Sequence, residues 1–270
     1  MFNSAHSTAY GWLMLAGIFV SIALWSRVAK RDSRLVLIYI AALAGAFLGA
    51  KLVYVAAEGW LHWHDENRWL ILATGKSITG ALLGGYAAVE IAKRMLGYRS
   101  ATGDWFAIIA PVGIMLGRIG CVLHGCCLGR ACGASWFTVN DAHGVDRWPA
   151  AQAELVFNAL ALVVILLLRG RARHSVRAAR DSGNVGAHGV TRPTNDSVFA
   201  GQLFHIYLIG YGLFRFVHEF WRETPQILGP LSGYQIAALA LVILGTVGFV
   251  RRRTVGQRHR ENQSTPAFIN

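Results

Sequence analysis

Long apolar stretches separated by short charged segments are the feature that most limits what this chain can fold into. A helix needs roughly 20 mostly apolar residues to cross ~30 Å of hydrocarbon. Of 270 residues, 54% are hydrophobic and only 15% are charged, whereas soluble domains average about 25% charged residues. Apolar runs lie near residues 10–26, 35–56, 76–96, 105–124, 149–168, 199–220 and 232–250. The pattern predicts an all-α, polytopic membrane protein with about seven transmembrane helices.

The third run is rich in small residues, and a short apolar segment precedes it. Residues 69–74 are too few to span a bilayer, so we expect them to dip into the membrane without crossing. Gly80, Gly84 and Gly85 give the third run a small-residue face. Such faces let transmembrane helices approach closely, so the sequence predicts tight helix packing there.

The positions of Lys and Arg predict how the helices are oriented, because cytoplasmic loops carry an excess of both. They gather in the segments 27–34, 93–99, 169–192 and 251–260, which follow every second apolar run. The intervening loops hold only Arg68, Arg130, Arg147 and Arg222. We therefore expect the N-terminus outside and the C-terminus in the cytoplasm. The net charge of +12 then reflects topology, and nucleic acid is not an expected partner.

The same pattern gives the expected domain organisation. Residues 1–250 form a single transmembrane domain with a polar, flexible cytoplasmic loop at 169–198. Residues 251–270 form a basic, disordered cytoplasmic tail. The first ten residues carry no Lys or Arg, so the first run is expected to remain as a helix rather than to be a cleaved signal peptide.

Two arginines fall inside apolar runs, where a charged side chain costs roughly 2.5 to 3.5 kcal/mol at a helix centre. Arg118 lies late in the fourth run. Arg215 lies in the sixth, with Tyr211 and Glu219 four residues away on either side, a spacing that places all three on one helix face. With the expected orientation, these groups lie in the outer half of the bilayer, at the depth of lipid headgroups.

We expect Glu219 to neutralise one arginine and to leave the other for a lipid phosphate, which a guanidinium binds with two hydrogen bonds. The alternative is structural: Arg215 and Glu219 form a buried pair that locks the bundle, and Arg118 extends to the interface. Lys51 is also expected to reach the interface.

All four cysteines, Cys121, Cys126, Cys127 and Cys132, fall within one short segment at the end of the fourth run. The expected compartment is oxidising, so a disulfide from Cys126 or Cys127 to Cys132 is one interpretation. A reactive thiol beside Arg118 is a second. A structural metal site or an unpaired structural role is a third, although the spacing matches no standard zinc motif. We expect no cofactor and no dedicated metal site.

Two segments carry a resemblance to a known family: GRIGCVLHGCCLGR at 117–130 and GYGLFRFVHEFWR at 210–222. They resemble the prolipoprotein diacylglyceryl transferases of bacterial inner membranes, which also have seven spans and an outside N-terminus. Weaker similarities lie at GAKLVYV from Gly49, at SITGALLGG from Ser77, at Pro149 with Glu154, and at Gln235. The resemblance implies a multi-pass inner-membrane enzyme with its active site toward the periplasm.

The resemblance implies that the chain transfers the diacylglyceryl group of phosphatidylglycerol to the lipobox cysteine thiol of a preprolipoprotein, or to another thiol acceptor, and releases glycerol phosphate. Expected partners are these substrates and membrane lipids. The expected catalytic residues are Arg118, Arg215, Glu219, His124 and Cys126. The expected substrate-binding residues are Arg118, Tyr211, Arg215, Cys121, Thr79 and Gly129.

Three positions depart from the family pattern. Thr79 stands where the family has an essential His, Cys121 where its signature has Asn, and Cys126 where it has Glu. Thr79 has no pKa suited to deprotonating a thiol, so His124 is the best substitute base by residue type. These departures keep two alternatives open: a thiol-dependent membrane transferase acting on another lipid or acceptor, and a catalytically silent lipid-binding relative.

Overall fold

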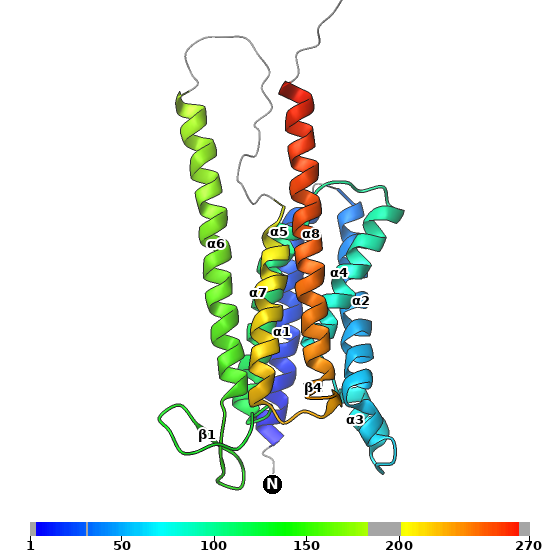
Figure 1. The fold of residues 1–270 in the computed structure, drawn as a ribbon, viewed down its shortest axis with the longest axis vertical. Coiled ribbons are helices and arrows are strands. Elements are labelled where there is room, and N and C mark those ends of the chain that lie inside the picture. The colour runs from blue at the N-terminus through cyan, green and yellow to red at the C-terminus, as the bar shows by residue number, and fades with distance from the viewer. Residues whose placement is uncertain (1–3, 31, 183–200, 265–270) are drawn as a thin grey trace, which may run out of the picture.

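Each of the seven apolar runs forms a helix, and the helices stand side by side in an elongated bundle (Figure 1). The structure is a computed structural model that describes residues 4–30, 32–182 and 201–264. The main helices are α1 (Ser4–Ala29), α2 (Arg34–Ala57), α4 (Ile78–Met95), α5 (Gly103–His124), α6 (Ala150–Ser182), α7 (Leu203–His218) and α8 (Gly233–Ser264).

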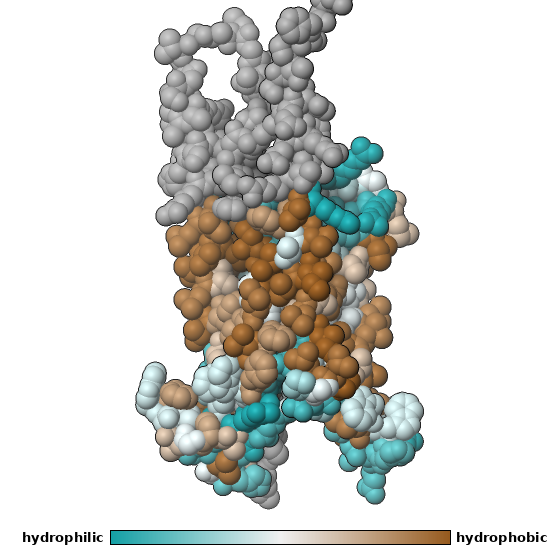
Figure 2. All heavy atoms as spheres, viewed as in Figure 1, coloured by the Kyte–Doolittle hydropathy of each residue, from teal (hydrophilic) through white to brown (hydrophobic). Residues whose placement is uncertain are grey.

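Five of these helices contain a segment long and apolar enough to cross a membrane: Gly11–Ala29, Arg34–Ala57, Gly103–His124, Ala150–Arg169 and Gly233–Arg252. Helix α4 carries three charged residues, Glu90, Lys93 and Arg94, and α7 has only 16 residues. Among the described residues, neither helix is therefore both long and apolar enough to count as a span. On the face shown in Figure 2, hydrophobic residues cover the middle of the bundle, with hydrophilic residues below them and at the upper right. The chain is a helical membrane protein.

Two segments expected to be unstructured are in fact partly helical. The prediction of a flexible loop from residue 169 was wrong for its first part, because α6 continues to Ser182. Likewise α8 continues to Ser264, inside the predicted tail. The segment 169–181 is rich in Arg and Ala, which are good helix formers. Residues 183–200 and 265–270 lie outside the described residues.

Glycines bring α2 and α4 into backbone contact. A Cβ on Gly49 would lie 2.3 Å from the carbonyl oxygen of Gly80, and one on Gly84 would lie 2.2 Å from that of Gly45. Gly85 faces the same helix at ordinary contact distance. The predicted small-residue face is confirmed. Because larger residues would push the helices apart, these glycines set how closely α4 packs on α2.

A short helical segment connects α2 to α4, formed by η1 (Gly59–His62) and α3 (Arg68–Thr74). The seven residues of α3 span only ~10 Å, so α3 does not cross a membrane, as predicted. Lys51 Nζ donates to the carbonyl oxygens of Leu72 and Gly75 at 2.9 Å each, and also to that of Ala73. Lys51 therefore holds the end of α3 in place. From the sequence we expected Lys51 only to reach the interface and did not predict these contacts.

The antiparallel arrangement brings the ends of α5 and α7 beside the starts of α4, α6 and α8, at the lower end of Figure 1. Short elements close this end: an antiparallel pair of β1 (Val139–Asn140) and β2 (Asp146–Arg147), the turn η2 (Glu219–Trp221), and a second pair of β3 (Gln226–Leu228) and β4 (Leu231–Ser232). Above them lies a core that includes Tyr207, Leu208, Tyr211 and Leu241. Residues far apart in sequence thus meet at one end.

Candidate active site

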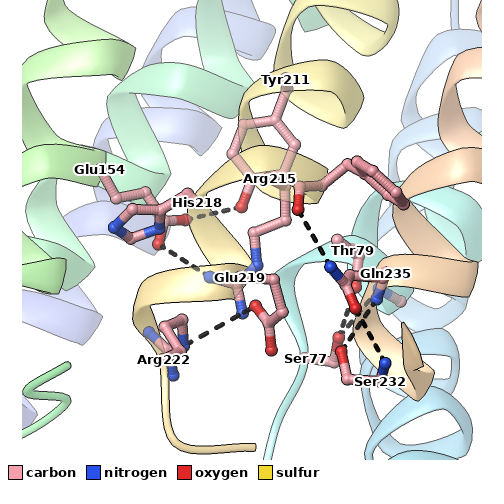
Figure 3. A network of polar contacts seen from close by, with 12 residues as sticks. Ser77, Thr79, Glu154, Tyr211, Arg215, His218, Glu219, Arg222, Ser232 and Gln235 are labelled. Carbon is pink, nitrogen blue, oxygen red and sulfur yellow. Dashed lines mark hydrogen bonds and ion pairs between the residues drawn. The ribbon is translucent and has the colours of Figure 1, made fainter. Parts of the chain in front are cut away.

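Glu154 is the centre of the polar network at this end of the bundle. It lies in the first turns of α6 and is completely buried. Its Oε2 atom lies 2.6 Å from Nη2 of Arg118 on α5. Its Oε1 atom accepts a 2.6 Å hydrogen bond from the hydroxyl of Tyr211 on α7 (Figure 3). One carboxylate therefore connects three helices.

Arg215 links Glu154 to a second carboxylate. Its Nη2 atom lies 2.8 Å from Oε2 of Glu219, and its Nη1 atom lies 4.0 Å from Oε2 of Glu154. The pairing of Arg215 with Glu219, which the structural alternative proposed, is formed, but Arg118 is buried against Glu154 and does not extend to the interface as that alternative expected. Arg222, just after η2, places its Nε atom 3.8 Å from the same Glu219 oxygen. We call Arg118, Arg215 and Arg222, with Glu154 and Glu219, the arginine site.

The charges of the arginine site do not balance. The expectation that Glu219 leaves either Arg118 or Arg215 without a carboxylate was wrong, because Glu154 pairs with Arg118 and Glu219 with Arg215. Arg222 supplies an additional cation, so three guanidinium groups face two carboxylates. At the arginine site one positive charge is left over.

Several N–H groups of the arginine site also lack an acceptor among the described residues. Nε of Arg118, Nη1 of Arg215, and both Nε and Nη1 of Arg222 are buried without a hydrogen-bond partner. The arginines contact Oε2 of Glu154 and the carboxylate of Glu219 as ion pairs. These carboxylate oxygens accept no aligned hydrogen bond either. A buried unpaired polar group costs about 1 to 3 kcal/mol, and more when charged. An anion with several oxygens would satisfy these donors.

Trp148 and His218 stand beside the network. The indole Nε1 of Trp148 donates to Nε2 of His218 at 3.1 Å, and the Trp148 ring stacks on Trp221 at 5.5 Å. Because an indole N–H only donates, Nε2 of His218 must accept and Nδ1 must carry the proton. That Nδ1 atom is buried without a partner in the described part of the chain, so His218 offers a donor here and not a base.

A second group of polar side chains lies next to Arg215 and Glu219 (Figure 3). The hydroxyls of Ser77 and Thr79 are 2.7 Å apart, and Thr79 is buried. Oε1 of Gln235 accepts from the backbone N–H of Ser232 at 2.9 Å. Hydroxyl and amide groups of this kind can hydrogen-bond a polyol, but they do not supply a general base. The substrate-binding role of Thr79 stays a prediction.

Three of the four cysteines form a compact group. The sulfur atoms of Cys121, Cys126 and Cys127 all lie within 4.8 Å of one another, and Nη1 of Arg118 donates to Sγ of Cys121 at 3.8 Å. Hydrogen bonds from the other two thiols, with the charges of Arg118 and Arg222, lower the pKa of Cys127. All four thiols are free and Cys132 is exposed outside the group, so the suggested bridge to Cys132 is not formed.

The remaining predicted residues lie around this group. His124 is the last residue of α5 and is half-buried; its role as base stays a prediction. Gly129 is buried, and a Cβ there would lie 2.6 Å from the carbonyl oxygen of Trp221 and 2.8 Å from Cβ of Trp148. Close packing therefore explains this glycine, and its contact with substrate stays a prediction.

Sequence reasoning missed two members of the arginine site. Glu154 was noted only as part of a family segment, although an acidic residue inside an apolar run is itself a signal of function. Arg222 looked like an ordinary loop residue. Its contact with Glu219 depends on the η2 turn, for which the sequence carried no clear signal.

Comparisons with known proteins identify the family of the chain. Residues 3–251 match the family model for prolipoprotein diacylglyceryl transferase. A Geobacter sulfurreducens protein named phosphatidylglycerol–prolipoprotein diacylglyceryl transferase is 29% identical over 265 residues, covering 92% of each chain. A Leptothrix cholodnii protein of the same name is 32% identical over 197 residues, covering 70% of this chain and 66% of that one. The chain belongs to the prolipoprotein diacylglyceryl transferase family.

Proposed function

We propose that this protein transfers the diacylglyceryl group of phosphatidylglycerol to a cysteine thiol of a prolipoprotein. Family membership supports the reaction class. The observation that carries the proposal is the surplus positive charge of the arginine site, together with its unpartnered N–H groups. The phosphodiester of phosphatidylglycerol carries one negative charge and several acceptor oxygens, which match that surplus and those donors.

The chemistry explains why positive charge is needed. The acceptor sulfur attacks the terminal glycerol carbon of the diacylglyceryl group, a C–S bond forms, and the bond from that carbon to the phosphate oxygen breaks. Glycerol phosphate leaves, and the thiol proton passes to a base or to the departing phosphate. Negative charge builds on the leaving oxygen, so preorganised cations stabilise the transition state.

The arginines and the carboxylates of the arginine site then have different roles. Arg118, Arg215 and Arg222 bind the phosphate, and their planar guanidinium groups suit two-point contacts with its oxygens. Glu154 and Glu219 position the guanidinium groups, and Tyr211 positions Glu154. Around them, Thr79, Cys121 and Gly129 line the region of the headgroup, and His124 is the candidate for receiving the proton of the thiol. Hydrogen bonds with Cys121 and Cys127, together with burial, raise the pKa of Cys126, so its thiol stays protonated and does not serve as the base.

The proposal includes a topology: seven transmembrane helices in the bacterial inner membrane, the N-terminus outside, the C-terminus in the cytoplasm, and the arginine site toward the periplasm. The alternation of basic loops supports the orientation. Two features support counting α4 and α7 as spans. The α4 backbone packs directly on the α2 span, and η2 extends α7 to Trp221.

The direct test is to incubate purified protein with labelled phosphatidylglycerol and a lipobox peptide and to analyse the products by mass spectrometry. We expect a peptide bearing a diacylglyceryl thioether, and an equal amount of glycerol phosphate. The Arg118→Ala variant should form neither product above background. Consumption of phosphatidylglycerol without thioether would contradict the proposed acceptor, and absence of turnover by folded wild-type protein would contradict the proposed reaction.

A further inference from the structure

The turn after α5 is built to bring three thiols together. Helix α5 ends at His124 and is capped by Gly125, which has a φ of 68°, and two residues later Cys127 has a φ of 61°. Cys127 is the one residue other than glycine with positive φ in the described part of the chain. Such a conformation costs a residue with a side chain about 1 kcal/mol or more, and it persists where the surrounding structure enforces it. Its result here is that Cys126 and Cys127 fold back toward Cys121.

We propose that Cys121, Cys126 and Cys127 bind one thiophilic cation, Zn²⁺ or Cu⁺. Thiolates are the preferred protein ligands of both ions. Zn–S bonds of ~2.3 Å place tetrahedral sulfur ligands about 3.8 Å apart, and the three sulfur atoms already lie within 4.8 Å of one another. Binding replaces three S–H bonds with three metal–sulfur bonds and releases three protons.

The surroundings suit a negatively charged metal–thiolate group. Three thiolates with Zn²⁺ carry one negative charge, and with Cu⁺ they carry two. Arg118 donates to Sγ of Cys121, so one guanidinium N–H already faces a ligating sulfur. Hydrogen bonds to ligating atoms from such neighbours orient the ligands and raise metal affinity.

The site also has a route of entry. Cys121 and Cys126 line a cavity of about 380 Å³ together with Asn140 and Gln152, and Cys127 is exposed. A disulfide would join two of the three sulfur atoms and leave the third unused. The three sulfur atoms of Cys121, Cys126 and Cys127 lie together while Cys132 lies outside the group, which favours one ligand bound by all three. The proposal replaces the expectation of no metal site, and it does not depend on the transferase reaction.

The test is metal binding by the purified, reduced protein after removal of metals with a chelator. Zn²⁺ and Cu⁺ are added separately in competition with a coloured chelator for each ion, and Co²⁺ serves as a spectroscopic probe for thiolate ligation. We expect one equivalent per chain, with a sulfur-to-cobalt charge-transfer band. Cys121→Ser, Cys126→Ser and Cys127→Ser should each lower the affinity by about 100-fold or more, and the matched control Cys132→Ser should leave it unchanged.

The outcomes separate clearly. Tighter binding of one ion over the other identifies the occupant and supports the site. Absence of stoichiometric binding by wild-type protein would overturn the proposal, as would equal binding by Cys127→Ser and Cys132→Ser. Recovery of Cys121 in a disulfide with Cys126 or Cys127, from protein purified with zinc present, would also overturn it.

Discussion

Charged side chains are partly or wholly buried at both ends of the bundle, but their partners differ. At the upper end in Figure 1, Arg252 donates to the carbonyl oxygen of Gly201 at 3.0 Å and lies 3.5 Å from Glu90. Lys93 lies 3.6 Å from the same carboxylate. The carboxylate of Asp104 accepts from the backbone N–H groups of Gly201 and Leu203. We call Glu90, Lys93, Asp104 and Arg252 the Arg252 cluster.

The comparison shows which buried charges are structural. In the Arg252 cluster Lys93 and Arg252 share the carboxylate of Glu90, and Arg252 and Asp104 bind backbone groups at the start of α7. None of these side chains has a buried polar atom without a partner among the described residues, whereas N–H groups of the arginine site do. Both sets contribute to the fold, but the arginine site also leaves buried donors for a ligand. Matched substitutions at the two ends test this difference.

The largest expected difference is in catalysis. Arg215→Ala should lower the rate of diacylglyceryl transfer by about 10²- to 10³-fold, the usual effect of removing one group that stabilises a developing negative charge. Arg252→Ala makes the same chemical change in the Arg252 cluster and should leave the rate nearly unchanged. The assay is thioether formation on a lipobox peptide at saturating phosphatidylglycerol. Equal losses in the two folded variants would remove the distinction between the ends.

The next difference is in stability. Glu154→Ala leaves Arg118 buried without its carboxylate, and breaking a buried ion pair in this way costs about 3 to 5 kcal/mol. Glu90→Ala removes a carboxylate that is one-third exposed, and pairs near the surface contribute about 1 kcal/mol or less. Thermal unfolding in detergent compares the two variants. A smaller shift for Glu154→Ala than for Glu90→Ala would contradict the view that Glu154 organises the arginine site.

A third difference lies in packing around the site. Gly129→Ala places a methyl group 2.6 Å from the carbonyl oxygen of Trp221, and overpacking of this kind costs about 1 to 3 kcal/mol. The variant should therefore unfold at a lower temperature and transfer more slowly. Gly133→Ala is the control on the same loop, because a Cβ there meets nothing within 4 Å. Equal unfolding temperatures for the two variants would contradict this prediction, because they would show that the loop can move away from Trp221 without loss of stability.

Most of the fold was predictable from sequence because it depends on local hydropathy. Each predicted apolar run coincides with a helix, and the run at 35–56 became Arg34–Ala57. The errors came where composition gives conflicting signals. Residues 169–182 are polar enough for a loop but contain enough Arg and Ala to continue α6, and the charged end of α4 weakens its resemblance to a span.

The site was predictable only in part. The spacing of Arg215 and Glu219 was enough to suggest their pairing, because the last turn of α7 continues into η2 and keeps residues four apart close together. The pairing of Arg118 with Glu154 joins α5 to α6, and hydropathy says nothing of which charges meet across helices. Likewise the clustering of the cysteines in sequence was visible, but the exclusion of Cys132 from the group depends on the turn at Cys127.

The smallest expected effect is on the local stability of the β1–β2 hairpin beside the arginine site, and it should leave the arginine site unaffected. The Arg147 guanidinium lowers the pKa of Asp141 to about 2 from its ordinary 3.8. A lowered pKa stabilises the folded state above the ordinary value, and the contribution is lost as the pH falls through the lowered one. Hydrogen exchange in residues 139–147 should therefore accelerate as the pH falls from about 3.8 to about 2, relative to unstructured peptides. In the Asp141→Asn variant, these residues should exchange faster at pH values above this range, and the acceleration between about pH 3.8 and about pH 2 should disappear. If the variant keeps the same acceleration, a group other than Asp141 causes it.

The surplus charge itself is tested by measuring phosphatidylglycerol binding with native mass spectrometry, with neutral diacylglycerol as the control ligand. Three proteins are compared: the wild type, Arg222→Gln, and the double variant Arg222→Gln with Glu219→Gln. Arg222→Gln removes the surplus and should weaken phosphatidylglycerol binding by about 10-fold or more, since a hydrogen bond to a charged group contributes about 1.5 to 3 kcal/mol. The double variant restores the surplus and should recover most of the affinity. Equal binding of phosphatidylglycerol by all three proteins would contradict the claim that this charge holds a lipid phosphate.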